Sequence, residues 1–327
     1  MSRTEQFLLG AGQSRAAIHV GLVNNMPDAA MRATELQFAK LLKAASGALD
    51  VRLRLFSLRA IARGEQARSR MAGFYDDAAF LQASSIDALI VTGAQPDAAD
   101  LRQEPYWPEL THLIDWAEVG TISTLFSCLA AHAAVMHLDG ICRRSLPSKL
   151  SGVFDSIRSE DDPLFFNTAV SVPVPHSRRN DIADNELAAK GYRILSRLEN
   201  GQVDIFTREP PGYSRFVFFQ GHPEYDPATL GREYLRDMGR HLRGEIQDRP
   251  AIPQYYFDRA TEDRLQGMPI QGRDDLSRFS EVVVGALPRQ SWRANTIKLF
   301  SNWLTLVAAT KMRRAASRSV HVRRRAS

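Results

Sequence analysis

Residues 123–135 read STLFSCLAAHAAV and combine a strand, a tight turn and a helix, which is the repeating unit of α/β folds. The first part of this stretch is a short apolar run that is typical of a buried strand, and the residues after Cys128 are typical of a short apolar helix. At such a tight turn the Cys128 side chain is exposed, and the positive end of the helix dipole favours its thiolate. Cys128 is therefore a candidate nucleophile, although a small buried apolar residue is the commoner role of a cysteine.

The same succession of strand and helix extends outward from this stretch. Buried strands are expected at 17–25, 86–91 and 122–127, a half-buried strand that alternates apolar and basic residues at 51–56, and helices at 31–42, 107–119 and 129–138. Strands that are apolar throughout indicate a mostly parallel sheet with helices on both faces, which is a doubly wound α/β fold. Ligands bind at the carboxyl ends of the strands in such sheets. Three of these ends carry polar or reactive residues, at 24–25, 92–94 and 127–128.

The second half of the chain is less regular. Short strands and turns are expected over 152–175, strands of a mixed edge at 192–195, 203–206 and 216–219, and helices at 230–242 and 297–309. Residues 246–288 are polar and contain Pro and Gly, which predicts an irregular excursion. The expected organisation is an N-terminal arm at 1–15, a single α/β domain at 16–310 and a basic, disordered tail at 311–327.

A second chemical signal is FFQGHPEYD at 218–226. His222 and Glu224 are two residues apart after an apolar strand, and such side chains share one face of an extended segment. A carboxylate beside an imidazole fixes its tautomer and raises its basicity, so Cys128, His222 and Glu224 could form a triad. Taken alone, a surface histidine beside an acid is the simpler interpretation. The amide of Leu129, with Gly93 and Ala94 of a neighbouring loop, is a candidate oxyanion hole.

Composition restricts the classes of function. The chain has 327 residues, 44% of them hydrophobic, and its only cysteines are Cys128 and Cys142, which excludes a disulfide scaffold or a thiolate zinc site. No run reaches the roughly 18 apolar residues of a membrane span, and no signal peptide or dinucleotide, P-loop or metal motif occurs. Without the seven basic residues of 311–327, the net charge of +5 becomes −2, which argues against a nucleic-acid-binding body. We expect a cytoplasmic protein with no metal and no bound cofactor.

The motifs as a set resemble those of the homoserine O-acyltransferases of the O-succinyltransferase type. The fold of that family is flavodoxin-like and is similar to the fold of class I glutamine amidotransferases. The matching stretches are NNMP (24–27), VTGA (91–94), YWPEL (106–110), STLFSC (123–128), SKLSGV (148–153), PHSR (175–178), GHPEYD (221–226), RD (236–237), PRQSWR (288–293) and NWL (302–304). They follow the order and spacing of the family. An amidotransferase would share only the cysteine and the HPE-like element, and its glycine-flanked cysteine is missing here.

The resemblance implies that an acyl group moves from acyl-CoA to Cys128 and then to the hydroxyl of homoserine, in methionine biosynthesis. It implies that His222 is the general base and that Glu224 orients it. Lys149, Ser177 and Arg236 match substrate-contacting positions, and the guanidinium of Arg236 is suited to an α-carboxylate. The implied partners are homoserine and acyl-CoA, with no nucleic acid and no membrane. A homodimer is expected only by analogy with the fold.

Two departures from the family pattern leave the donor and the acceptor open. Asp28 and Ala29 follow NNMP where basic residues are common, so CoA phosphates would need another partner, such as Arg32 or the tail. Asp97 occupies the position that selects the acyl donor, where glycine goes with succinyl and glutamate with acetyl. Its charge would repel a succinyl carboxylate by about 1 kcal/mol or more in a shielded pocket, which favours acetyl, whereas the family name points to succinyl. The sequence also allows serine as the acceptor, an amidotransferase-like hydrolase or a non-catalytic regulator.

Overall fold

The computed structural model describes residues 7–8, 17–270, 272, 275–286 and 291–325. Its central sheet is parallel, in the spatial order β3 (Val51–Ser57), β2 (Ile18–Val23), β5 (Ala88–Val91), β6 (Ser123–Ser127) and β11 (Arg215–Phe219). On β3, β4 (Tyr75–Asp77) pairs parallel and β1 (Phe7–Leu8) antiparallel. The predicted α/β fold with a parallel sheet flanked by helices is confirmed.

Side chains of the central strands alternate between two apolar layers. Leu125 of β6 belongs to the layer formed with α1 (Asp28–Ala45) and α9 (Arg293–Arg325), whereas Phe126 belongs to the layer with α3 (Trp107–Gly120) and α4 (Leu129–Asp139). In β11, Val217 belongs to the layer with α1 and α9, and Phe218 belongs to the layer with α3 and α4. Because both faces are buried, these strands are apolar throughout, which explains why their positions could be predicted.

Beyond β11 the sheet continues antiparallel through β10 (Val203–Arg208), β9 (Arg193–Leu198), β7 (Arg144–Arg158) and β8 (Ser171–Asp181). The prediction of short strands and turns over 152–175 is wrong, because β7 and β8 form one long hairpin. The strand β8 was not predicted because it contains Pro173 and Pro175, which are unusual within strands. They are tolerated because β8 is the edge of the sheet, where a missing N–H need not interrupt a hydrogen-bonded ladder.

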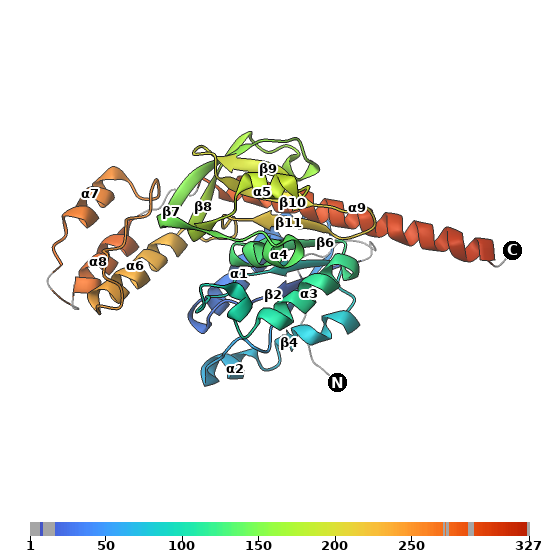
Figure 1. The fold of residues 1–327 in the computed structure, drawn as a ribbon, viewed down its shortest axis with the longest axis horizontal. Helices are drawn as coiled ribbons and strands as arrows, with labels where there is room; N and C mark the ends of the chain where they lie inside the picture. Colours follow the sequence, from blue (N-terminus) through green and yellow to red (C-terminus); the bar gives the residue numbers. More distant parts are fainter. Residues whose placement is uncertain (1–6, 9–16, 271, 273–274, 287–290, 326–327) are drawn as a thin grey trace.

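A helical lobe contains α6 (Thr229–Leu242), α7 (Arg259–Gly267) and α8 (Asp275–Gly285), which pack around a shared apolar cluster. Figure 1 shows this lobe at the end of the molecule opposite to the projecting end of α9. The irregular excursion predicted at 246–288 is therefore wrong where α7 and α8 form. The helix α7 is short and mostly polar, so it left little periodicity in the sequence, whereas α8 has apolar residues at helical spacing, among them Phe279, Val282 and Val283, which were not recognised in the sequence. The Asp258 side chain caps α7 by accepting from the amide of Thr261 at 2.8 Å.

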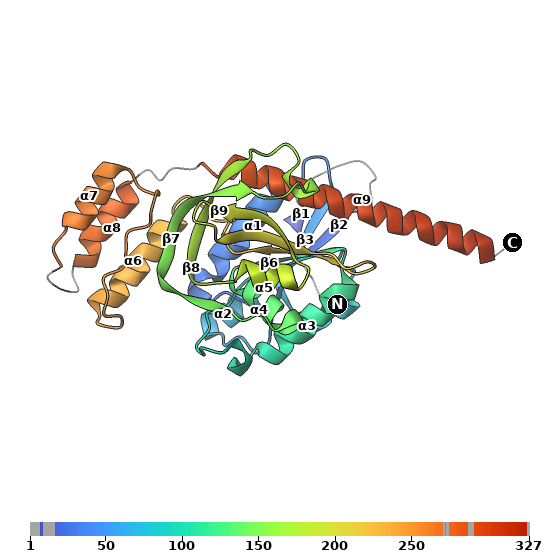
Figure 2. The ribbon, with the colours of Figure 1, turned by 45° about the horizontal axis from the view of Figure 1, so that its top comes forward.

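The last helix, α9, continues to Arg325, so the prediction of a disordered tail at 311–327 is wrong for the described residues up to 325. The ammonium of Lys311 donates to the carbonyl of Ala17 at 2.7 Å and to the carboxylate of Asp87 at 2.6 Å, which anchors the middle of the helix to the sheet. The end of α9 projects past the sheet in both views (Figures 1 and 2). The arm predicted at 1–15 lies outside the described residues, except for β1.

Several short elements were not predicted. They are α2 (Glu65–Met71), α5 (Asp184–Ala189) and the 3₁₀ turns η1 (Ala78–Ala83), η2 (Leu101–Gln103) and η3 (Pro163–Phe165). Across the described part of the chain, we find no helix with the length and apolar character that a membrane crossing demands.

Candidate active site

Cys128 occupies a strained turn between β6 and α4. Its φ is 51° and its ψ is −112°, a conformation that residues other than glycine rarely adopt and that is typical of functional sites. The Cys128 amide donates to the carbonyl of Phe219 at 2.7 Å, and its carbonyl accepts from the amide of Ala131 at 2.9 Å. The half-buried thiol is thus held at the carboxyl edge of the sheet, at the N-terminus of α4.

His222 reaches the same edge from the loop that follows β11. The parallel pairing sets Phe219 opposite Ser127, so the residues that follow β6 and β11 meet. His222 Nδ1 lies 2.9 Å from Glu224 Oε1, and both side chains are buried. The Cys128 side chain acts on the same imidazole and helps to raise its pKa. The structure therefore brings together the three residues that the sequence suggested as a triad.

The electrostatics of this group favour a charged imidazole. Burial alone would lower the pKa of His222, but the charges of Cys128 and Glu224, together with hydrogen bonds to both, raise this pKa well above its ordinary value of 6.5. A protonated His222 stabilises a thiolate at Cys128, which is the reactive form of a cysteine nucleophile.

A second polar cluster adjoins His222. The ring of Tyr225 stacks on the imidazole with the ring centroids 4.3 Å apart. The Tyr225 hydroxyl donates to Glu233 at 2.8 Å, and the hydroxyl of Ser177 donates to the other oxygen of the same carboxylate. Glu233 lies on α6, so this helix of the lobe contributes directly to the edge of the site.

Lys149 and Arg236 extend the cluster. The ammonium of Lys149 donates to Asp237 at 2.8 Å and lies 3.8 Å from Glu233. Arg236 Nε donates to Asp237 at 3.0 Å, while 56% of its side chain is exposed. Lys149, Ser177 and Arg236, which were predicted to contact substrate, thus converge on two acids of α6. Sequence reasoning did not identify Glu233 or Asp237 as site residues, although acids four apart on one helix share a face and could have indicated them.

The candidate oxyanion-hole residues lie together. A Cβ atom built on Gly93 would be 2.9 Å from the Cβ of Leu129 and 3.2 Å from its amide nitrogen, so the two backbones are in close approach. Gly93, Ala94 and Leu129 line one small cavity with Asn25, Thr92 and Tyr106. Leu129 is the first residue of α4, and its N–H has no acceptor one turn earlier in the helix. This N–H can donate to a developing oxyanion.

Asp97 lies on the loop after β5 and is exposed. The loop is held by the amide of Ala98, which donates to Glu104 at 2.6 Å, and by Arg143, which donates to the carbonyl of Ala99 at 2.8 Å. Water and salt screen an exposed carboxylate. The charge argument against a succinyl donor is therefore weaker than the sequence suggested.

Asp28, which also departs from the family pattern, has structural partners. Its carboxylate lies 3.2 Å from Arg63 and accepts from the amide of Gly64 at 2.8 Å. The nearly buried Arg63 side chain donates to the carbonyls of Met26 at 2.5 Å and Asn24 at 3.0 Å. Arg63 thus fixes the loop after β2, and Asp28 helps to hold Arg63.

Two further histidines lie outside this group. His132 is fully buried one turn after Cys128, and burial lowers its pKa to about 3, so it is neutral. His137 contacts Asp115 at 2.6 Å on an exposed part of the surface. Among the residues that the structure describes, no three His, Cys, Asp or Glu side chains gather as metal ligands do.

Comparison with known proteins gives consistent matches. A family model described as homoserine O-succinyltransferase matches residues 9–313. A homoserine O-succinyltransferase of Rhodopseudomonas palustris is 49% identical over 300 residues, which is 89% of this chain and 89% of the relative. One from Bradyrhizobium japonicum is 46% identical over 313 residues, 92% of this chain and 95% of the relative. Among solved structures, a glutamine amidotransferase of Thermotoga maritima superimposes with a TM-score of 0.50 and 12% identity, over 90% of this chain and 99% of that chain, which shows a shared fold alone.

Proposed function

The chain belongs to the homoserine O-succinyltransferase family and is a homoserine O-acyltransferase, and from this premise we propose that it moves a succinyl group from succinyl-CoA to homoserine through a thioester on Cys128. The observation that carries the mechanism is the contact of Cys128, on its strained turn, with a buried His222 whose pKa is raised. Such a pair is the usual means of activating a cysteine for acyl transfer.

The first half-reaction forms the acyl-enzyme. The Cys128 thiolate attacks the thioester carbonyl, and the carbonyl oxygen becomes an oxyanion. The amide of Leu129, next to Gly93, is placed to donate to this oxyanion. When the tetrahedral intermediate collapses, the bond to the CoA sulfur breaks, and the proton of the His222 imidazolium passes to the departing thiolate.

The second half-reaction transfers the acyl group to the acceptor. Neutral His222 takes the proton of the homoserine hydroxyl as its oxygen attacks the thioester carbonyl, and Cys128 leaves as a thiolate. The imidazolium then again faces a thiolate, as at the start. Glu224 holds Nδ1–H throughout, so that the second ring nitrogen faces the reacting atoms.

The polar cluster on α6 suits the charges of an amino acid acceptor. Homoserine carries an α-carboxylate and an α-ammonium group. The half-exposed guanidinium of Arg236 is available for the carboxylate, and the carboxylate of Glu233, one turn away on the same helix, suits the ammonium. Ser177 and Lys149 hold Glu233 in place from the β7–β8 hairpin.

Succinyl is the proposed donor group because the relatives at 49% and 46% identity are named O-succinyltransferases and because Asp97 is exposed to screening by water. The proposed reaction needs acyl-CoA as a co-substrate and no bound cofactor. A cytoplasmic location in methionine biosynthesis is part of the proposal, and the low cysteine content fits a reducing compartment. The homodimer stays a prediction.

The test supplies purified protein with homoserine and either succinyl-CoA or acetyl-CoA, and follows thiol release and the mass of the amino acid product. Cys128→Ala is the control and is expected to give no product. With succinyl-CoA alone, the intact protein is expected to gain one succinyl group, and the control none. If acetyl-CoA gives a product with homoserine and succinyl-CoA does not, the proposed donor is wrong. Faster turnover of serine would overturn the acceptor, and ammonia release from glutamine would favour an amidotransferase-like hydrolase.

A further inference from the structure

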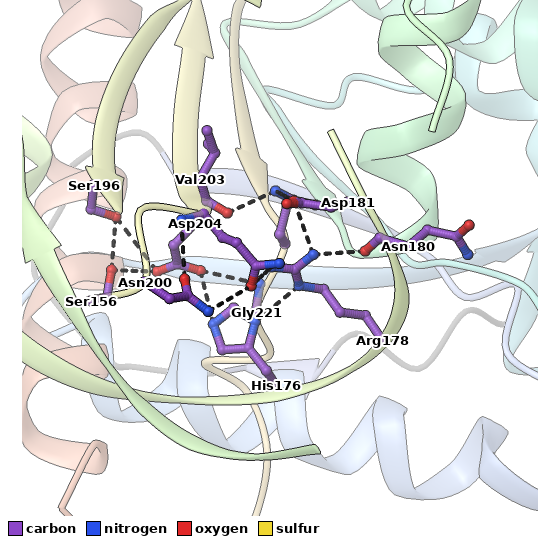
Figure 3. Close-up of polar contacts among 12 residues, drawn as sticks. Ser156, His176, Arg178, Asn180, Asp181, Ser196, Asn200, Val203, Asp204 and Gly221 are labelled. Atoms are coloured by element: carbon purple, nitrogen blue, oxygen red, sulfur yellow. Dashed lines mark hydrogen bonds and ion pairs between the residues drawn. The ribbon is translucent and has the colours of Figure 1, made fainter. Parts of the chain in front are cut away.

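A second buried histidine–aspartate pair lies next to the loop that carries His222. His176 of β8 and Asp204 of β10 are fully buried, and His176 Nε2 lies 3.3 Å from Asp204 Oδ1. Figure 3 shows the pair among polar side chains that come from β7, β8, β9 and β10. The proposed acyl transfer does not use either side chain.

Asp204 is held as a carboxylate. Burial would raise its pKa, but the contact with His176, the hydrogen bond from Ser156 and the charge of Arg178 lower this pKa overall. The Ser156 hydroxyl donates to Oδ2 at 2.5 Å, and the amide of Gly221 donates to Oδ1 at 3.2 Å. Asp204 thus accepts hydrogen bonds from two different parts of the chain.

His176 is the neutral member of the pair. Burial lowers its pKa. Its Nδ1 accepts from Arg178 Nε at 3.4 Å, so in the neutral ring the proton is on Nε2, which faces Asp204. At 3.3 Å and without good alignment, this approach is an electrostatic contact rather than a strong hydrogen bond.

Asp204 and the neighbouring strand β8 fix the main chain immediately before the catalytic histidine. The amide of Gln220 donates to the carbonyl of Asp204 at 2.9 Å, and the amide of Gly221 donates to its carboxylate. The amide of His222 donates to the carbonyl of Pro175, on β8, at 2.7 Å. Three successive amides are therefore fixed to β10 and β8, and the His222 side chain extends from the last of them.

Gly221 lies in direct contact with the pair. A Cβ atom at this position would be 2.8 Å from His176 Nε2 and 2.9 Å from Asp204 Oδ1. Nothing separates the loop from the pair, so a shift of the Asp204 carboxylate moves the residue that precedes His222.

We propose that Asp204 is a positioning residue for acyl transfer: its buried carboxylate, held by Ser156 and His176, sets the main chain of residues 220–222 and so the orientation of the His222 imidazole toward Cys128. The inference rests on the proposed function for the role of His222. Burying a carboxylate is costly unless hydrogen-bond donors are aimed at it, and here they come from Ser156 and from the loop itself.

The test replaces Asp204 by Asn, which keeps the shape and removes the charge. We expect kcat for acyl transfer to fall by about 10²-fold, the usual cost of a misplaced catalytic group, while KM for both substrates stays nearly unchanged. Alkylation of Cys128 by iodoacetamide at a fixed pH should become slower, because a displaced imidazolium activates the thiol less. The titratable groups that act on His222 (Cys128, Glu224, Tyr225 and His176) all stay in place.

Asp162→Asn is the matched control. Asp162 is also a buried carboxylate, bound by Arg193 at 3.0 Å and by Arg215 at 2.6 Å, but Arg215 begins β11 whereas His222 follows the end of β11. This variant is expected to lower the melting temperature and to leave kcat and the alkylation profile unchanged. Ser156→Ala, which removes one donor and keeps the carboxylate, is expected to change kcat and alkylation in the same direction as Asp204→Asn, but less.

Normal kcat and normal alkylation in Asp204→Asn would overturn the proposal, as would an equal loss in Asp162→Asn. If Asp204→Asn does not fold, unchanged kinetics in Ser156→Ala would overturn it. Alkylation needs no acyl substrate. If the unsubstituted protein is alkylated at Cys128 but transfers no acyl group, the proposed function is wrong. The alkylation rates of the variants then still test whether Asp204 positions His222.

Discussion

The imidazole of His222 and the phenol ring of Tyr225 lie stacked, with centroids 4.3 Å apart and planes 18° apart. The Tyr225 hydroxyl donates to Glu233 of α6. One buried aromatic ring therefore joins the catalytic base to the cluster that is proposed to bind the acceptor. A substitution at Tyr225 can therefore affect acceptor binding and the catalytic base to different extents.

Tyr225→Phe keeps the stacked ring and removes the hydrogen bond to Glu233. A hydrogen bond to a charged group contributes about 1.5–3 kcal/mol, so KM for homoserine is expected to rise about 10-fold or more, with a smaller change in kcat. Steady-state kinetics with homoserine as the varied substrate measure this, and Tyr213→Phe, at an exposed tyrosine, is the control. A fall in kcat with an unchanged KM would contradict the role given to Glu233.

Gly93→Ala places a methyl group against the first residue of α4. Because its Cβ would lie 3.2 Å from the Leu129 amide nitrogen, we expect this donor to move and kcat to fall by about 10²-fold, the cost of losing one oxyanion-hole donor. Gly267→Ala makes the same chemical change where no atom lies within 4 Å, and it should leave kcat unchanged. If Gly93→Ala keeps full activity, the Leu129 amide is not a donor of the oxyanion hole.

Glu224→Gln tests the raised pKa of His222 through stability. The folded protein holds this proton more tightly than the unfolded chain, so the stabilisation is complete below the ordinary value of 6.5 and is lost as the pH rises through the raised value. Removing the Glu224 charge should make the free energy of unfolding fall less steeply above pH 6.5. Denaturant titrations on both sides of pH 6.5 measure the slope, with Glu199→Gln, at an exposed position, as the control. Identical slopes would mean that Glu224 does not raise this pKa.

Arg63→Met leaves the carbonyls of Asn24 and Met26 without their charged donor. Since hydrogen bonds to charged groups contribute about 1.5–3 kcal/mol each, the free energy of unfolding should fall by about 2 kcal/mol or more. Arg59→Met is the matched control, because the Arg59 side chain is 72% exposed and its ion pair with Asp77 should contribute less than about 1 kcal/mol. Equal destabilisation of the two variants would show that Arg63 does not fix the loop after β2.

The sequence was most informative in the parallel half of the sheet. Strands buried on both faces are apolar throughout, and each is followed by a helix, so β2, β5 and β6 could be found without a structure. The strand β11 was expected in a mixed edge, whereas it pairs parallel with β6. Cys128 and His222 follow two of these strands. Because parallel strands end at the same edge, the prediction that the two side chains meet needed only the topology. The motif resemblance to the homoserine O-acyltransferases is confirmed by the family match.

The remaining features depend on contacts between segments that are distant in the chain. The β7–β8 hairpin was not recognised because its prolines are tolerated only in an edge strand, and the short polar helix α7 has few apolar residues to show a period. No sequence pattern marks Asp204, and the roles of Glu233 and Asp237 were not recognised from their spacing on one helix. Their partners are distant in the chain, since Lys149 and Asp237 are separated by 88 residues and Ser156 and Asp204 by 48. Local residue patterns specify strands, helices and turns, whereas the pairing of buried charges depends on which segments the sheet brings together, and that is a property of the whole fold.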